Sequence, residues 1–218
     1  MIILFDLDGT LIDSTDAIVS TFHHSFKVHN TQAVKDEEIK ALIGYPLDIM
    51  YARLGISEDK VWSFVATYKE EYRKISTIKT DLLQNAVEAV KKASKFATLG
   101  IVTTKTGKYS KILMEHFNLM KYFEVLIGRE DVNNPKPDAE PILKALENLD
   151  TINKDVWMIG DTKLDLIAAQ NANVNSIGVL CGYGDKESLK KFSNVILNDA
   201  LEAVLYLEGM KKQHTFFT

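Results

Sequence analysis

Two aspartates, Asp6 and Asp8, follow the apolar run of residues 2–5 near the start of the chain. If the extended conformation continues through Asp8, both side chains point to the same side of the strand. Two such charges repel by about 1 kcal/mol at 4 Å in water and by about 4 kcal/mol near a protein surface. We therefore expect a cation or a shared proton beside them.

Further polar residues follow other apolar runs. They carry hydroxyl, ammonium and carboxylate groups. They are Thr103, Thr104 and Lys105 after the second run, Lys136 in the segment NPKPDAEP, and Asp161 and Asp165 in the segment GDTKLDL; Gly9 and Thr10 directly follow the aspartates of the first run. Ligands bind outside the carboxyl ends of the strands in an open parallel sheet. We therefore expect these residues to meet at one edge of such a sheet.

Carboxylates grouped with a hydroxyl and an ammonium group suit a hard divalent cation and a phosphate better than they suit zinc, which prefers Cys and His. Mg²⁺ is the ion that we expect. Asp6 is then a candidate nucleophile that forms an aspartyl-phosphate, and Asp8 is the candidate acid and base beside it. Thr103 can donate a hydrogen bond to the transferring group, and Lys136 can offset charge on the nucleophile and the phosphate.

Each of these residues also has an ordinary structural interpretation. An aspartate after a strand is commonly a turn or helix-capping residue, which would explain Asp161 or Asp165 taken singly. A lysine between two prolines, such as Lys136, is commonly solvated, and threonines at a strand end are commonly β formers or N-caps. The coincidence of these residues at the ends of successive strands favours the catalytic interpretation.

The elements that would position these residues alternate along the chain. Short apolar runs rich in β formers occupy residues 2–5, 98–103, 124–128, 156–159 and 175–179, and segments with helical apolar spacing occupy residues 83–95, 106–118 and 138–149. This alternation predicts an α/β fold, a doubly wound parallel sheet with helices on both faces.

One interval breaks this alternation. About 90 residues separate the first apolar run from the second, far more than one crossover helix needs. Residues 15–80 have helical character throughout, with breaks at Gly44, Pro46 and Gly55. We therefore predict a helical cap at residues 15–80, inserted into an α/β catalytic core of residues 1–14 and 81–218. The final segment, KKQHTFFT, is predicted to be a frayed tail.

The composition is that of an ordinary globular protein, with 46% hydrophobic and 26% charged residues. A net charge of −4 offers no general attraction to nucleic acid or to an anionic membrane, so we expect neither as a partner. Cys181 is the only cysteine, and no stretch approaches the roughly 20 apolar residues that span a bilayer. We expect a cytoplasmic monomer or homodimer that acts on a small phosphorylated metabolite.

Four motifs resemble those of the haloacid dehalogenase-like hydrolases, in the same order and over residues 3–207. FDLDGTLIDS looks like the first motif, GIVTTK like the second, KPDAEP like the third and MIGDTKLDL like the fourth. The resemblance implies the roles already given for Asp6, Asp8, Thr103 and Lys136, and a phosphate site formed by Gly9, Thr103, Thr104 and Lys136. It also implies that Mg²⁺ binds the Asp6 carboxylate, the Asp8 backbone carbonyl and Asp161, with Asp165 in support.

The insertion resembles the small helical cap of the phosphoglycolate phosphatase branch of this family. We therefore expect a phosphatase for a small phosphomonoester, with phosphoglycolate as the best single candidate. Thr104 stands where many relatives have Asn, and the resulting VTTK segment resembles a pyrophosphatase branch, which makes inorganic pyrophosphate the nearest rival. Arg53, Lys69 and Arg73 of the cap are candidates to bind a substrate carboxylate or a second phosphate.

Two alternatives are less favoured. A sugar-phosphate mutase of the same family usually has a histidine twelve residues after the nucleophile, and this chain has Ile18 at that position. A non-catalytic phosphate-binding module could use the same scaffold, because fold does not determine function. Asp8 argues against that module, since a protein that only binds phosphate does not need a group that transfers protons.

Overall fold

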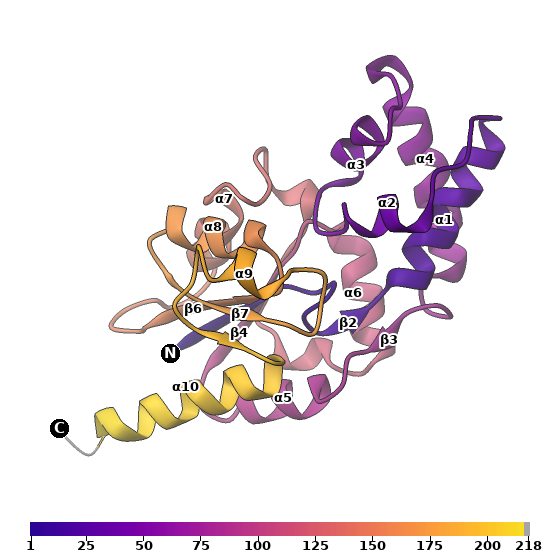
Figure 1. Ribbon diagram of the computed structural model, residues 1–218. Coiled ribbons are helices and arrows are strands. Elements are labelled where there is room, and N and C mark those ends of the chain that lie inside the picture. The colour runs from indigo at the N-terminus through magenta and orange to yellow at the C-terminus, as the bar shows by residue number, and fades with distance from the viewer. Residues whose placement is uncertain (216–218) are drawn as a thin grey trace.

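The structure is a computed structural model that describes residues 1–215. Its centre is a parallel sheet whose six strands run in the order β5-β4-β1-β6-β7-β8 (Figure 1). The strands are β1 (Ile2–Phe5), β4 (Thr98–Val102), β5 (Val125–Ile127), β6 (Val156–Gly160), β7 (Asn175–Val179) and β8 (Ile196–Leu197). The strand order reverses at β1, which pairs with β4 on one side and with β6 on the other. The crevice at the carboxyl end of β1 is therefore the expected ligand position.

The side chains of β1 alternate between two apolar layers, because successive residues of a strand point to opposite faces. Ile3 and Phe5 belong to a hydrophobic cluster that includes residues of three helices, α5 (Ala86–Ala93), α6 (Gly107–His116) and α10 (Ala200–Thr215). Ile2 and Leu4 belong to a second cluster with residues of α7 (Glu140–Glu147) and α8 (Lys163–Asn171). Both faces of the sheet are covered, which confirms the predicted doubly wound α/β fold.

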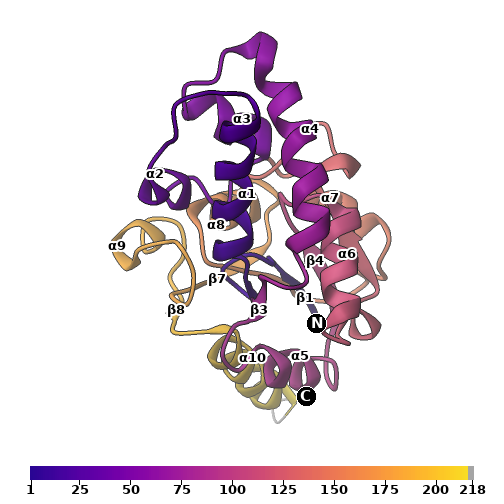
Figure 2. The same cartoon turned by 90° about the vertical axis from the view of Figure 1, so that its right-hand side faces the viewer.

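Four helices follow β1 and form a separate group beyond the carboxyl edge of the sheet (Figure 2). They are α1 (Thr15–Val28), α2 (Asp36–Lys40), α3 (Leu47–Arg53) and α4 (Glu58–Ile75). Aromatic side chains hold this group together: the ring centroid of Tyr51 lies 4.5 Å from that of Phe22 and 5.4 Å from that of Phe64. Buried aromatic pairs of this kind stabilise a fold beyond the contribution of their buried area. We call these four helices the cap helices.

A short antiparallel ribbon connects the cap helices to the rest of the chain. It consists of β2 (Ile12–Asp13) and β3 (Asp81–Leu82), with Ile12 opposite Leu82 and Asp13 opposite Asp81. The sequence analysis did not predict these strands, because two residues are too few to show a strand pattern. The division predicted at residues 15 and 80 falls beside this ribbon.

The remaining elements are short, and one prediction for the chain end is wrong. The 3₁₀ helices cover Met120–Tyr122 and Arg129–Asp131, and α9 covers Lys186–Leu189. The predicted frayed tail begins at Lys211, but α10 continues to Thr215 and Lys211 Nζ donates a hydrogen bond to a backbone carbonyl 2.7 Å away. The rest of that tail, residues 216–218, lies outside the described residues. Among the described helices, none has the length and hydropathy needed to cross a membrane.

Candidate active site

Asp6 directly follows the last residue of β1 and is buried, with 4% of its surface exposed. Lys136 Nζ lies 2.9 Å from Asp6 Oδ1, but no described donor forms a well-aligned hydrogen bond to this oxygen. Burial raises the pKa of Asp6 to about 7, repulsion by Asp165 adds to the rise, and attraction to Lys136 opposes it. The carboxylate predicted to be the nucleophile therefore has a buried oxygen available to a ligand.

Lys136 lies inside the site, where 2% of its side chain is exposed. Its Nζ donates a hydrogen bond to the Val102 carbonyl at 2.9 Å and another to Asp165. Burial by itself lowers the pKa of Lys136, but the attraction of Asp165 and Asp6 outweighs this effect and raises the pKa. The interpretation of Lys136 as a solvated loop lysine is therefore wrong, because its positive charge is fixed beside Asp6.

Asp165 positions Lys136 and also caps α8. Its Oδ2 accepts hydrogen bonds from the backbone N–H and the hydroxyl of Thr162, at 3.0 and 2.7 Å, which closes the capping box of the helix. Its Oδ1 accepts the hydrogen bond from Lys136. Both oxygens are thus engaged within the protein: one caps the helix and the other holds Lys136. The predicted support of a metal ion by Asp165 stays a prediction.

Asp161 follows β6 and is fully buried. Thr10 Oγ1 donates a hydrogen bond to its Oδ1 at 3.0 Å, and the Tyr183 N–H donates one to its Oδ2 at 2.8 Å. Burial raises the pKa of Asp161 well above its usual value, and repulsion by Asp165 and Asp6 adds to this rise. A neighbouring cation would therefore stabilise the ionised form of this carboxylate.

Gly9 is required beside Asp161 for two reasons. Its φ of +84° lies in the left-handed region, and a Cβ at this position would be 2.3 Å from Asp161 Oδ2. Its N–H donates a hydrogen bond to the Ile12 carbonyl at 2.8 Å. The structure therefore gives Gly9 a role in packing against the carboxylate, and its predicted contact with phosphate stays a prediction.

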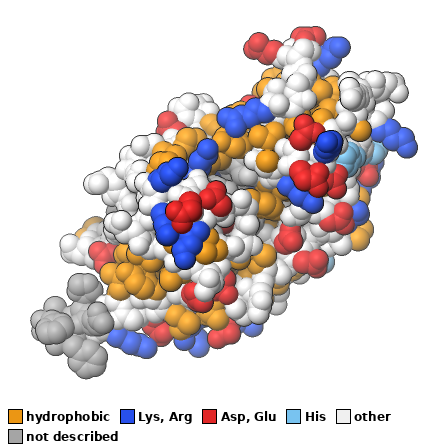
Figure 3. Space-filling model, viewed as in Figure 1, with side chains coloured by type: hydrophobic (Ala, Val, Ile, Leu, Met, Phe, Trp, Pro, Cys, Tyr) orange, Lys and Arg blue, Asp and Glu red, His pale blue; other side chains and the backbone are white. Residues whose placement is uncertain are grey.

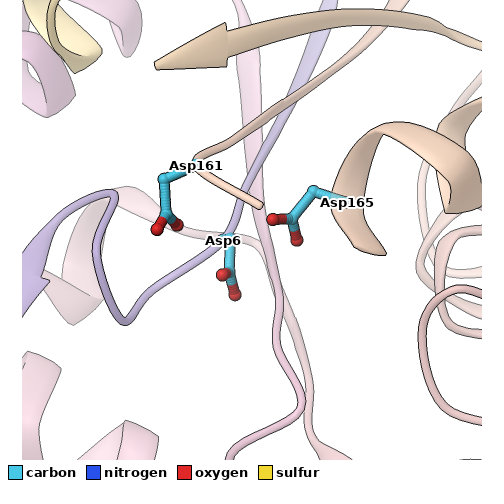
Figure 4. A group of neighbouring side chains, drawn as sticks. All are labelled: Asp6, Asp161 and Asp165. Atoms are coloured by element: carbon cyan, nitrogen blue, oxygen red, sulfur yellow. The ribbon is translucent and has the colours of Figure 1, made fainter. Parts of the chain in front are cut away.

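Three buried carboxylates converge at this edge of the sheet, as Figure 4 shows. One oxygen from each of Asp6, Asp161 and Asp165 lies within 4.8 Å of the others. When all three are ionised, the single ammonium group of Lys136 leaves two negative charges uncompensated. A hard divalent cation with oxygen ligands matches this excess, and the Asp6 carboxylate, whose Oδ1 has no aligned hydrogen-bond donor, can provide a ligand atom. The residues fit Mg²⁺, with Asp6 and Asp161 as the carboxylates that would hold it.

Asp8 turns away from this cluster. The strand ends at Phe5, so the extended conformation does not continue through Asp8, and the Asp8 side chain is not part of the carboxylate cluster. The predicted binding of Mg²⁺ by the Asp8 backbone carbonyl stays a prediction. The Asp8 carboxylate accepts hydrogen bonds from Lys105 Nζ, at 3.0 and 3.1 Å, and from the Ser14 hydroxyl. Each of the two aspartates therefore has its own lysine beside it, Lys136 for Asp6 and Lys105 for Asp8.

Lys105 lies in the site, although no role was predicted for it from the sequence. Its side chain is 9% exposed, and its Nζ lies 4.7 Å from the centroid of the Tyr72 ring. Burial lowers the pKa of Lys105, but the attraction of Asp8 outweighs burial and raises it. The only signal in the sequence is its position two residues after Thr103, at the end of a predicted strand.

The two threonines after β4 have different surroundings. Thr103 is 4% exposed, and its hydroxyl accepts a hydrogen bond from the Lys105 N–H at 3.2 Å. Thr104 instead donates a hydrogen bond to the Gly44 carbonyl at 2.8 Å, so it connects the strand end to the loop before α3. The phosphate contacts predicted for both threonines stay predictions.

The three basic residues predicted in the cap differ in their surroundings. Lys69 is half-buried and lines a cavity between the cap helices and the strand ends. The Arg53 guanidinium lies 4.0 Å from the centroid of the Tyr45 ring, and Arg73 is exposed on α4. Neither arginine lines the cavity, so Lys69 is the one of the three that is placed near the site.

Acidic groups and a lysine are buried at the carboxyl end of β1, where the strand order of the doubly wound sheet reverses. This arrangement is typical of an α/β enzyme that acts on a ligand at the carboxyl edge of its sheet. A model of the family described as haloacid dehalogenase-like hydrolase matches residues 3–179. The chain belongs to the haloacid dehalogenase-like hydrolases, as the four motifs indicated. The prediction that it is a hydrolase enzyme is thereby confirmed.

Relatives match nearly the whole chain. The pyrophosphatase PpaX of Bacillus cereus strain G9842 is 32% identical over 204 residues, which cover 93% of this chain and 94% of that protein. Among solved structures, a predicted phosphatase from Clostridium acetobutylicum is 26% identical, covers 95% of this chain and 98% of its own, and superposes with a TM-score of 0.85. A haloacid dehalogenase-like family hydrolase from Streptococcus pneumoniae is 25% identical, covers 94% and 97%, and has a TM-score of 0.84.

Proposed function

We propose that the protein is a Mg²⁺-dependent phosphatase that hydrolyses a small phosphomonoester through an aspartyl-phosphate on Asp6. The observation that supports this most strongly is the Asp6 carboxylate, which is buried at the end of the central strand, lies 2.9 Å from Lys136 and has an oxygen without an aligned donor. A carboxylate oxygen that no aligned donor occupies and a fixed ammonium group are what an aspartyl nucleophile needs to attack a phosphate.

In the first half of the reaction, an oxygen of Asp6 attacks phosphorus and the bond between phosphorus and the alcohol oxygen breaks. Asp8, protonated at this stage, gives its proton to the departing oxygen. Lys136 offsets negative charge on the phosphoryl group while it is transferred. Mg²⁺, when it is bound by Asp6 and Asp161, supplies further charge neutralisation at the phosphoryl oxygens.

In the second half, Asp8 is a carboxylate, and its oxygens accept the hydrogen bonds from Lys105 and Ser14. It takes a proton from a water molecule whose oxygen attacks phosphorus. The bond between phosphorus and Asp6 breaks, and inorganic phosphate leaves. The closeness of Asp6 and Asp8 on one short segment supports this division of roles between a nucleophile and a proton-transfer group.

Inorganic pyrophosphate is the second candidate substrate, because the relative from Bacillus cereus that matches nearly the whole chain is named a pyrophosphatase. A structure named for phosphoglycolate phosphatase, from Lactobacillus plantarum, is 22% identical and supports the fold alone. Mutase activity is less favoured, because Ile18 lines the cavity beside Asp8 and an apolar side chain cannot exchange a proton with a sugar hydroxyl.

The decisive experiment is the release of phosphate from 4-nitrophenyl phosphate by the purified protein. We expect turnover with Mg²⁺ that stops when a chelator is added. The variant Asp6→Asn should fold and bind phosphate, but it should show no turnover because an amide is a poor nucleophile. Acid quenching of the wild type should yield a phosphorylated peptide that contains Asp6. Turnover that survives chelation would contradict the metal requirement, and turnover by the variant would contradict the covalent step.

A further inference from the structure

A cavity of about 250 Å³ lies beside the active site. Asp8 and Lys105 line one side of it, and residues of α1, α3 and α4 line the other. In the proposed reaction, the alcohol part of the substrate leaves next to Asp8. The cavity is therefore the space that this alcohol part occupies, and the chemistry of its wall selects the substrate.

Apolar and aromatic side chains make up most of this wall. The rings come from five residues, Tyr45, Trp62, Tyr68, Tyr72 and Tyr109. Trp62 is 65% exposed although it lines the cavity, so most of its ring contributes nothing to the packing of the cap helices. A large exposed ring at a concave site is typical of a contact with a ligand.

Several charged groups of the wall are already engaged within the protein. Lys105 is paired with Asp8, Glu130 accepts a hydrogen bond from the Gly107 N–H at 2.8 Å, and Arg129 donates one to a backbone carbonyl at 3.0 Å. Figure 3 shows Lys and Arg interspersed with Asp and Glu over one face of the molecule. Lys69, half-buried on α4, also lines the wall and is the cation that a second phosphate or a carboxylate could meet. Such a group would still enter a largely apolar space, at a cost of desolvation.

We propose that the substrate is a phosphomonoester whose alcohol part is a single aromatic ring or an apolar group of similar size. This proposal rests on the phosphatase function proposed above. An apolar cavity of roughly 150 Å³ takes up benzene. A cavity of about 250 Å³ therefore has room for one ring and the atom that links it to the phosphate.

The test compares benzyl phosphate with methyl phosphate, phosphoglycolate and pyrophosphate at fixed Mg²⁺. Benzyl and methyl phosphate release alkyl alcohols of similar acidity, so their comparison isolates binding of the ring from leaving-group chemistry. Burial of a ring of this size predicts a kcat/KM for benzyl phosphate that is about tenfold or more above that for methyl phosphate. A kcat/KM for any of the other three that equals or exceeds that for benzyl phosphate would overturn the proposal.

Two variants test whether the preference for benzyl phosphate over methyl phosphate arises from the wall of the cavity. Trp62→Ala should lower the ratio of kcat/KM for benzyl phosphate to that for methyl phosphate by about threefold to tenfold, because one aromatic contact is lost. Leu47→Asn should lower the same ratio by placing an amide in the apolar wall. Ile78→Ala is the matched control, because Ile78 is 80% exposed and does not line the cavity. An unchanged ratio in both cavity variants would refute the assignment.

Binding of benzylphosphonate separates this proposal from the phosphatase function. Its phosphorus–carbon bond is not hydrolysed, so calorimetry reports affinity without turnover. We expect the wild type to bind it more tightly than methylphosphonate, and Trp62→Ala to reduce the difference. Failure of the phosphatase proposal would appear as no turnover of any ester, whereas equal affinity for the two phosphonates would refute the aromatic preference.

Discussion

The ammonium group of Lys105 contacts both carboxylate oxygens of Asp8, at 3.0 and 3.1 Å, and also lies over the ring of Tyr72. A residue shortly after β4 is thereby joined to Asp8, the proposed acid and base that follows β1, and to cap helix α4. The pair lies at the boundary between the active site and the cavity, where the bond to the leaving group breaks in the proposed reaction.

Replacing this lysine tests whether the pair serves catalysis. We expect Lys105→Met to lower kcat for 4-nitrophenyl phosphate by about tenfold to a hundredfold, because Asp8 loses the donor that orients its carboxylate. Thermal stability should also fall, since a buried charge is left without its partner. Lys108→Met, at an exposed position on α6, is the control and should change neither quantity. An unaltered kcat in Lys105→Met would show that the pair has no catalytic role.

Gly9 and Gly55 offer a comparison that isolates the contact with Asp161. Both have positive φ, at +84° and +88°, but a Cβ at Gly55 would meet nothing within 4 Å. We expect Gly55→Ala to cost about 1–2 kcal/mol of stability from backbone strain alone. Gly9→Ala should cost more and should abolish Mg²⁺ binding, measured by calorimetry, because the Cβ displaces the Asp161 carboxylate. Equal effects of the two substitutions would contradict this account of Gly9.

Replacement of Thr104 tests whether its hydroxyl contacts the loop before α3 or the phosphate of the substrate. Its hydroxyl donates to the Gly44 carbonyl at 2.8 Å, so we expect Thr104→Val to raise KM for 4-nitrophenyl phosphate severalfold by loosening this link. The inhibition constant of inorganic phosphate should stay the same, because the phosphate site is untouched. The exposed Thr151→Val serves as the control. A weaker inhibition by phosphate in Thr104→Val would instead support the phosphate contact predicted from the sequence.

The acidic cluster predicts how stability depends on pH when Mg²⁺ is absent. The pKa of Asp6 is raised from 3.8 to about 7 by burial, so between these values the folded protein binds more protons than the unfolded chain. The free energy of unfolding must then fall as pH rises through this range. Chemical denaturation with chelator should show lower stability at about pH 7.5 than at about pH 5.

Two further measurements check the cause of this dependence. Asp6→Asn should flatten it, because the amide does not titrate. Mg²⁺ should restore stability at about pH 7.5, because the cation binds the ionised carboxylates of the folded state. A wild type whose stability rises with pH over the same range without Mg²⁺ would show that the cluster carries no unfavourable charge.

The sequence predicted the five main strands and the edge at which the polar residues meet, because both follow from apolar runs and from the rule for parallel sheets. The burial of Lys136 could be inferred only from its coincidence with the other motifs. The pairing of Lys105 with Asp8 could not be read from the sequence, since it depends on where the strands β1 and β4 place two distant residues.

The structure differs from the sequence-based predictions at two places, and each difference has a local physical reason. The extended conformation stops at Phe5, so both aspartates lie beyond the strand and the rule that places alternate residues on one side no longer applies to them. The end of α10 was predicted to fray because it lies at the chain end, but the helix continues to Thr215, and Lys211 donates a hydrogen bond to the Phe96 carbonyl in the segment after α5. Such contacts between distant segments leave no periodic signal in the sequence.

The ribbon of β2 and β3 has a consequence for how this enzyme can diversify. Because Asp13 and Asp81 face each other across it, the intervening residues form an excursion whose two ends are already side by side. Shortening, lengthening or exchanging that excursion leaves every strand of the main sheet, and therefore the position of Asp6, unaltered. New substrate preferences can thus arise by replacing one contiguous stretch of the gene while the buried carboxylates of the main sheet are inherited unchanged.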